Sequence, residues 1–190
     1  MRTIVAHGWR GYPEKGWFPW LKEELEIRGF DVSIPQFPLS EKTPYVWIRI
    51  LENVIGTPDK ETFLVGHSIG CQTIVRYLEK LSPNEKIGGA VFVAGFFKPI
   101  KNHSDMQEIN SKWVMKPLDF NKVREHCQNS VAIFSDDDPY VSLENQAVFK
   151  EQLGSEIIIE HKKKHLSGET ETTNIPSVLK AILKLCEWNP

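Results

Sequence analysis

The hydrophobic positions of the chain fall into short apolar runs separated by longer amphipathic stretches. The apolar runs predict strands at 3–6, 30–34, 62–65, 87–94, 130–134 and 156–160. Between them, apolar residues recur at helical spacing, which predicts helices at 17–27, 46–55, 71–81, 143–153 and 175–186. This alternation is typical of a parallel sheet with right-handed crossovers. We therefore expect an α/β fold of three layers, with about six mostly parallel strands and helices on both faces.

One segment departs from this alternation. Between residues 95 and 129 the pattern is irregular, with polar stretches interrupted by aromatic residues. We interpret it as a small cap-like excursion of loop and helix and not as a second domain. With 190 residues, 41% of them hydrophobic, the chain is long enough to bury one core. The prediction is a single α/β domain over 1–190.

Composition narrows the classes of partner. The formal net charge is −2, which gives no reason to expect nucleic acid or an anionic membrane surface. No apolar run approaches the length of a membrane span, and Met1 leads directly into strand-like residues, so we expect neither a membrane anchor nor a signal peptide. The three cysteines lack metal-binding spacing. We expect no metal or cofactor and a cytoplasmic location.

The turn Gly66-His67-Ser68-Ile69-Gly70 carries the strongest chemical signal in the chain. It lies between a predicted buried strand and a predicted helix, which is the layout of a nucleophile elbow. Such a turn holds Ser68 in a strained backbone geometry and leaves room only for glycine on either side. It also directs the N–H of Ile69 toward a developing oxyanion. The alternative interpretation is an ordinary tight turn between strand and helix.

A serine nucleophile needs a base and a group that orients the base. In parallel sheets, functional residues gather at the carboxyl ends of the strands. The predicted strand 130–134 is followed by three consecutive aspartates, 136–138, and the strand 156–160 by His161 and His165. The resulting order of Ser, Asp and His is that of α/β-hydrolases. Spacing alone leaves the aspartate open and favours His165 only weakly over His161.

The chain resembles the small α/β-hydrolases of the YdeN and retinoblastoma-binding protein 9 type, a serine hydrolase family, over nearly its whole length. The matching features are the opening strand into His7-Gly8, the elbow, Gly95-Phe96, the segment Asp-Asp-Pro-Tyr-Val and the histidine near the end. The resemblance implies that Ser68 is the nucleophile, Asp138 the acid and His165 the base.

Two alternatives to this assignment stay open. Asp138 fits the pattern of Asp, two residues, then Val141, yet Asp137 remains the rival acid. His161 remains the rival base, because the family usually places glycine directly before the catalytic histidine. Here the lysine run 162–164 precedes His165.

The fold also implies a second oxyanion donor in the loop after the first strand. We expect the backbone N–H of Trp9 in that role beside Ile69, and we expect Phe96 and Trp113 to line the substrate pocket. The predicted function is a serine hydrolase that cleaves small carboxylic esters through an acyl-enzyme, with amides or thioesters accessible to the same machinery. The alternative is a weak or inactive hydrolase fold that acts through protein–protein interaction. The sequence identifies no protein partner.

Overall fold

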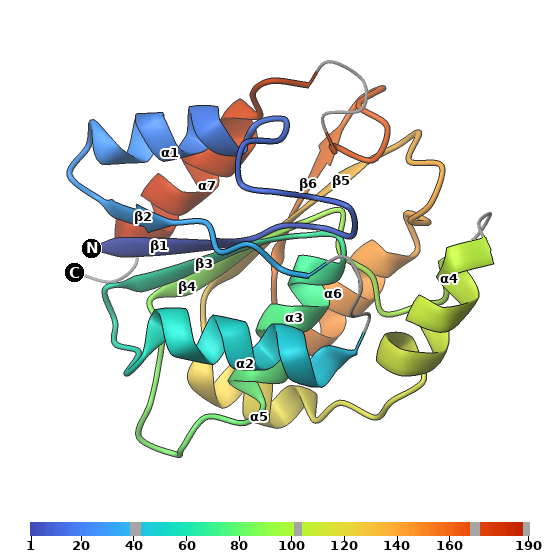
Figure 1. The fold of residues 1–190 in the computed structure, drawn as a ribbon, viewed down its shortest axis with the longest axis horizontal. Helices are drawn as coiled ribbons and strands as arrows, with labels where there is room; N and C mark the ends of the chain where they lie inside the picture. The colour runs from blue at the N-terminus through green and yellow to red at the C-terminus, as the bar shows by residue number, and fades with distance from the viewer. Residues whose placement is uncertain (39–42, 101–103, 168–171, 188–190) are drawn as a thin grey trace.

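The fold is built on a sheet of six strands in the order β2-β1-β3-β4-β5-β6 (Figure 1). The computed structural model describes residues 1–38, 43–100, 104–167 and 172–187. Every neighbouring pair of these described strands is parallel. The strands are β1 (Arg2–Ala6), β2 (Asp31–Ser33), β3 (Thr62–His67), β4 (Gly89–Val93), β5 (Ser130–Ser135) and β6 (Glu156–Glu160).

The long helices alternate with these strands, as the hydrophobic pattern predicts. They are α1 (Phe18–Glu26), α2 (Pro44–Ile55), α3 (Ile69–Leu78), α6 (Asn145–Leu153) and α7 (Pro176–Glu187). Helices α1 and α2 both carry proline at the start, where its missing N–H removes no intrahelical bond. The prediction of a three-layer α/β fold is confirmed. Within the described ranges, no helix is both long and apolar enough to cross a membrane.

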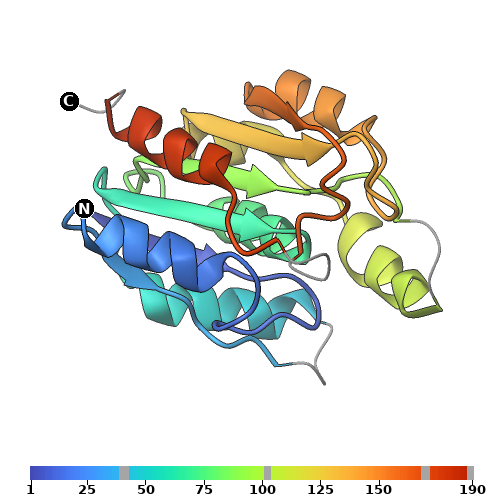
Figure 2. The same cartoon turned by 90° about the horizontal axis from the view of Figure 1, so that it is seen from above.

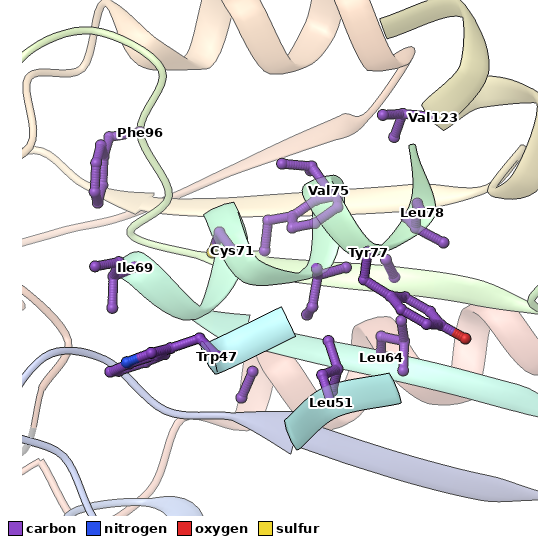
Figure 3. Packing of buried hydrophobic residues seen from close by; sticks show 14 of the residues in the cluster. Trp47, Leu51, Leu64, Ile69, Cys71, Val75, Tyr77, Leu78, Phe96 and Val123 are labelled. Atoms are coloured by element: carbon purple, nitrogen blue, oxygen red, sulfur yellow. The ribbon is translucent and has the colours of Figure 1, made fainter. Parts of the chain in front are cut away.

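Side chains of successive strand residues pack into two separate hydrophobic clusters, one on each face of the sheet. Along β3, Phe63 and Val65 pack with α1 and α7, whereas Leu64 packs with the cluster that includes α2, α3 and α6. Figures 1 and 2 show these two groups of helices on opposite faces of the sheet. In the second cluster, Trp47 and Ile69 lie at the end nearest Phe96 (Figure 3).

The segment after β4 is more helical than the sequence pattern suggests. It contains α4 (Ser104–Ile109), a single π-helical turn η1 (Asn110–Val114) and α5 (Phe120–His126). Each is too short to show a clear amphipathic period. The buried guanidinium of Arg76, on α3, ties this segment to the core by donating hydrogen bonds to the carbonyl oxygens of Trp113, Lys116 (3.0 Å) and Pro117 (3.3 Å).

Candidate active site

Ser68 alone makes the turn from β3 to α3. The strand ends at His67 and the helix begins at Ile69, so the backbone changes from extended to helical within one residue. Ser68 has φ 54° and ψ −118°, outside the regions that non-glycine residues ordinarily occupy. Such strain costs about 1–3 kcal/mol and is typical of functional sites. The N–H of Ser68 donates to the carbonyl of Val93 at 2.8 Å, which anchors the strained residue to β4.

Both flanking glycines are required by backbone contacts. A Cβ on Gly66 would lie 2.8 Å from the backbone nitrogen of Cys71, in the first turn of α3. A Cβ on Gly70 would lie 2.0 Å from the carbonyl oxygen of Ala6, in β1. The elbow is therefore packed between a neighbouring strand and its own helix, and neither position has room for a side chain.

His165 lies between the serine and one carboxylate. Its Nε2 is 3.0 Å from Ser68 Oγ, and its Nδ1 is 2.8 Å from Asp138 Oδ2. The three residues follow β3, β5 and β6, so the parallel sheet brings them to the same edge from distant parts of the chain. A hydrogen-bonded Ser–His–Asp arrangement of this kind can activate a serine hydroxyl for attack on a carbonyl.

The carboxylate of Asp138 is held by its own loop. Oδ1 accepts hydrogen bonds from the N–H groups of Tyr140 (2.8 Å) and Val141 (3.0 Å), which leaves Oδ2 for the imidazole of His165. The side chain of Asp138 is 2% exposed, so water does not compete for these contacts. This turn gives a physical reason for the spacing between Asp138 and Val141.

The other acidic and basic candidates have different partners. Asp136 Oδ2 accepts from His161 Nδ1 at 2.7 Å, and the His161 side chain is 82% exposed. Hydrogen bonds from the Lys162 N–H and from His161 lower the pKa of Asp136, while the same carboxylate raises the pKa of His161. Asp137 Oδ1 accepts from Lys164 N–H at 2.8 Å. Geometry thus joins Ser68 to His165 and Asp138, and pairs Asp136 with His161.

Two further histidines support the loops of the site. His67 Nε2 donates to the backbone carbonyl of His165 at 2.9 Å. Burial lowers the pKa of His67 to about 3, so its ring is neutral near pH 7. His7 is fully buried, and burial lowers its pKa as well. Its Nε2 accepts from the N–H of Phe37 at 3.0 Å, which leaves Nδ1–H to donate to the Gly8 carbonyl at 2.9 Å.

The Gly8 carbonyl fixes the orientation of the peptide that follows it. Besides the bond from His7, it accepts from the N–H of Gly11 at 3.0 Å. In a trans peptide the N–H points away from the carbonyl oxygen, so the Trp9 N–H is directed opposite to these two donors. Trp9 and Ile69 both line the pocket over Ser68, and Ile69 is the first residue of α3, where backbone N–H groups lack intrahelical partners.

A cavity of about 100 Å³ opens beside the serine and the imidazole. Phe96, Ile100 and Ile109 give it an apolar wall. Tyr140 also lines it and packs edge-on against the His165 ring, with centroids 5.1 Å apart. The sequence predicted Phe96 at the pocket but not Ile100, Ile109 or Tyr140. Tyr140 could have been predicted from the sequence, because it follows Asp138 by two positions.

Trp113 is not part of this wall. The structure places it in the core, with no exposed surface, edge-on against Trp47 at a centroid distance of 6.0 Å. The expectation that Trp113 contacts substrate is therefore replaced by a packing role. Its helical segment does reach the pocket, but through Ile109.

Other reactive groups near the elbow are occupied in structural contacts. The Cys71 thiol is buried and donates to the carbonyl of Gly66 at 3.2 Å. Burial raises the pKa of this thiol, so it remains protonated and unreactive near neutral pH. Within the part of the chain that the structure describes, no three His, Cys, Asp or Glu side chains are grouped to hold a metal ion.

Comparison with known proteins identifies the family and agrees with the fold. YdeN of Bacillus subtilis (strain 168) is 28% identical over 179 residues, which cover 93% of this chain and 92% of YdeN. The serine hydrolase RBBP9 of Rattus norvegicus is 23% identical over 183 residues, covering 95% and 93%. The crystal structure of YdeN superposes with a TM-score of 0.90 at 26% identity, over 98% of each chain. The serine hydrolase family model matches residues 3–184, and the chain belongs to that family.

Proposed function

We propose that the protein is a serine esterase that hydrolyses small carboxylic esters through an acyl-enzyme on Ser68. The observation that carries the proposal is the position of His165, which reaches Ser68 Oγ at 3.0 Å and Asp138 Oδ2 at 2.8 Å. The strained backbone of Ser68 adds support, because it presents Oγ to the pocket and to the imidazole. In the proposed assignment Ser68 is the nucleophile, His165 the base and Asp138 the acid.

Acylation begins when Ser68 Oγ attacks the ester carbonyl carbon and His165 Nε2 takes the hydroxyl proton. Asp138 accepts the Nδ1–H bond and stabilises the imidazolium that forms. The negative charge on the carbonyl oxygen is stabilised by the backbone N–H groups of Ile69 and Trp9. When the tetrahedral intermediate collapses, the imidazolium gives its proton to the departing alkoxide and the acyl group stays on Ser68.

Deacylation repeats these roles with water as the nucleophile. His165 Nε2 removes a proton from water as the oxygen attacks the acyl carbon, and the same two N–H groups stabilise the second oxyanion. Collapse releases the carboxylic acid, and the proton on His165 returns to Ser68 Oγ. The cycle consumes one water and needs no external oxidant, reductant or cofactor.

The pocket favours a short acyl or alcohol group. Its volume is about 100 Å³, and its apolar wall comes from Phe96, Ile100 and Ile109. Pockets for drug-sized ligands run to about 300–1,000 Å³, so this one suits a group of a few heavy atoms. We therefore expect acetate and propionate esters to be better substrates than octanoate esters.

The proposal is tested with a fluorophosphonate probe and p-nitrophenyl acetate. Wild-type protein should be labelled at Ser68, with peptide mass spectrometry locating the adduct, and should hydrolyse the ester. Ser68→Ala should give an unchanged circular dichroism spectrum, no label and no turnover above the buffer rate. Folded wild-type protein that takes no label and hydrolyses none of a panel of esters, thioesters and amides would instead favour the interaction-protein alternative.

A further inference from the structure

Two loops of the site are joined by a series of hydrogen bonds. They are the acid loop, residues 135–138 at the end of β5, and the histidine loop, residues 162–166 after β6. Three consecutive backbone N–H groups of the histidine loop donate to three consecutive side chains of the acid loop. The pairs are Lys162 N–H with Asp136 Oδ1 (2.8 Å), Lys163 N–H with Ser135 Oγ (2.9 Å) and Lys164 N–H with Asp137 Oδ1 (2.8 Å). The imidazole of His165, hydrogen-bonded to Asp138, is the next contact in the same series.

The histidine loop is strained where these contacts are made. Lys162, Lys164 and Leu166 have φ values of 55°, 52° and 53°, in the left-handed region that non-glycine residues rarely occupy. A loop with this conformation persists only when surrounding contacts determine it. Since His165 lies between two of the strained residues, the contacts that hold them also set the position of its ring.

Asp137 makes the central contact of the series. Its Oδ1 accepts both from Lys164 N–H at 2.8 Å and from the hydroxyl of Ser135 at 2.9 Å, and that hydroxyl in turn accepts from Lys163 N–H. One oxygen atom therefore fixes two successive residues directly before the histidine. The other oxygen, Oδ2, pairs with the ammonium of Lys164 at 2.8 Å.

The acceptor oxygen of Asp137 contributes more to holding the histidine loop than the charge of its carboxylate does. The ion pair with Lys164 is open to solvent, with side chains 27% and 53% exposed, and such pairs contribute little. Bonds from the side chain and backbone of Lys164 hold the pKa of Asp137 at about 2, so the carboxylate is an acceptor at any pH at which the protein is assayed. Any substitution of Lys164 other than proline keeps its backbone N–H as a donor to Asp137 Oδ1.

We propose that Asp137 is a positioning residue for His165: its Oδ1 holds the strained loop 162–166 in the register that brings the imidazole to Ser68. The role is distinct from that of Asp138, which contacts the imidazole itself. This inference rests on the proposed function, since it presumes that His165 is the base. It assigns the aspartate next to the acid a task of its own.

Two substitutions at this position separate geometry from charge. In Asp137→Asn, the amide oxygen takes the place of Oδ1 and keeps both hydrogen bonds, while only the ion pair is lost. In Asp137→Ala all three contacts disappear. We expect Asp137→Ala to lower kcat for p-nitrophenyl acetate by about 10- to 100-fold with KM changed less than about threefold, because a misplaced base weakens the chemical step and not binding. We expect Asp137→Asn and Lys164→Met to stay within about threefold of wild type.

A second measurement does not depend on turnover. Amide hydrogen exchange at Lys163 and Lys164 should accelerate in Asp137→Ala and keep its wild-type rate in Asp137→Asn, with exchange in β3 and β4 unchanged in both. Ser135→Ala, which removes the partner of Lys163 N–H, should give an intermediate loss of kcat. If Asp137→Ala does not fold, Ser135→Ala and Asp137→Asn still decide the matter by the same two readouts.

The outcomes distinguish failure of the positioning role from failure of the proposed function. Equal loss of kcat in Asp137→Asn and Asp137→Ala would overturn the proposal and assign the effect to charge. Near wild-type kcat and exchange in Asp137→Ala would overturn it as well, by showing that the loop holds itself. If wild-type protein took no label at Ser68, the proposed function would be wrong. Faster amide exchange of the loop in Asp137→Ala would still show that Asp137 holds the histidine loop.

Discussion

The imidazole of His67 donates a hydrogen bond from Nε2 to the backbone carbonyl of His165 at 2.9 Å. The residue before Ser68 thus holds the main chain of His165, the base in the proposed mechanism. Because Nε2 is the donor, the neutral ring carries its proton there. The His67 ring also lies edge-on to the His165 ring, with centroids 5.1 Å apart. Protonation of His67 would place a second positive charge beside the imidazolium.

A pH dependence of stability follows from the low pKa of His67. The pKa is about 3 in the folded protein and about 6.5 when unfolded. Below pH 6.5 the unfolded chain binds a proton at His67 that the native state excludes. The contribution of His67 to the free energy of unfolding is therefore complete above pH 6.5 and is lost as pH falls toward 3. From pH 8 to pH 5 this group should remove about 2 kcal/mol from the free energy of unfolding.

His67→Gln isolates that contribution, because glutamine can donate to the His165 carbonyl but does not titrate. Urea unfolding of both proteins at several pH values should give a shallower decline for the variant. His7 and the carboxylates remain in both proteins and cancel in the difference. Parallel pH curves for the two proteins would show that His67 does not stay neutral in the fold.

The assignment of the acid is tested by exchanging carboxylate for amide at two neighbouring positions. Asp138→Asn should lower kcat for p-nitrophenyl acetate on the order of 10⁴-fold, because the amide no longer orients and stabilises the protonated imidazole. Asp137→Asn is the matched control and should stay close to wild type. The reverse result, with Asp137→Asn crippled and Asp138→Asn active, would make Asp137 the acid.

Arg76 should be essential for holding the segment 113–117 to α3. Arg76→Met removes the donor to three carbonyls, and leaving buried acceptors without partners should lower the free energy of unfolding by about 2–4 kcal/mol. Hydrogen exchange should accelerate first in η1 and α5. Arg49→Met is the control, since Arg49 lies on the outer side of α2 and bonds to Tyr45. Equal stability of the two variants in urea would contradict this role.

Phe96 and Trp113 should separate into a selectivity residue and a packing residue. Phe96 lines the pocket, so Phe96→Ala should raise kcat/KM for butyrate esters relative to acetate esters by about tenfold, the effect of one or two methylene groups. Trp113 is buried away from the pocket, so Trp113→Ala should cost about 3–5 kcal/mol of stability with the ester preference unchanged. A changed ester preference in Trp113→Ala, measured where the variant is folded, would return Trp113 to the substrate site.

The sequence predicted the sheet and its long helices because short apolar runs mark the strands and apolar residues at helical spacing mark the helices. The elbow was equally visible, since the glycines that its contacts demand lie at fixed distances from Ser68. The short helices after β4 were not, because α4 has six residues and η1 five. Runs of that length complete fewer than two helical turns and leave no periodic signal.

The choice among Asp136, Asp137 and Asp138 could not be made from spacing, because all three contact the histidine loop. What distinguishes them is the partner that each one contacts: Asp136 and Asp137 accept from the backbone N–H groups of Lys162 and Lys164, whereas Asp138 contacts the imidazole of His165. Trp113 was misplaced for a related reason. A tryptophan in an irregular segment near the strand ends fits a pocket wall and a buried anchor equally well, and only the packing against Trp47 decides.

The distance along the chain between Ser68 and His165 has a consequence for refolding. The two residues are 97 positions apart, and β4 and β5 lie between β3 and β6, the strand that leads into the histidine loop. Parallel pairing between distant segments forms slowly compared with helices. A refolding chain should therefore regain its helical signal first and its ester hydrolysis later. The lag between the two signals should measure how long β6 takes to pair with β5.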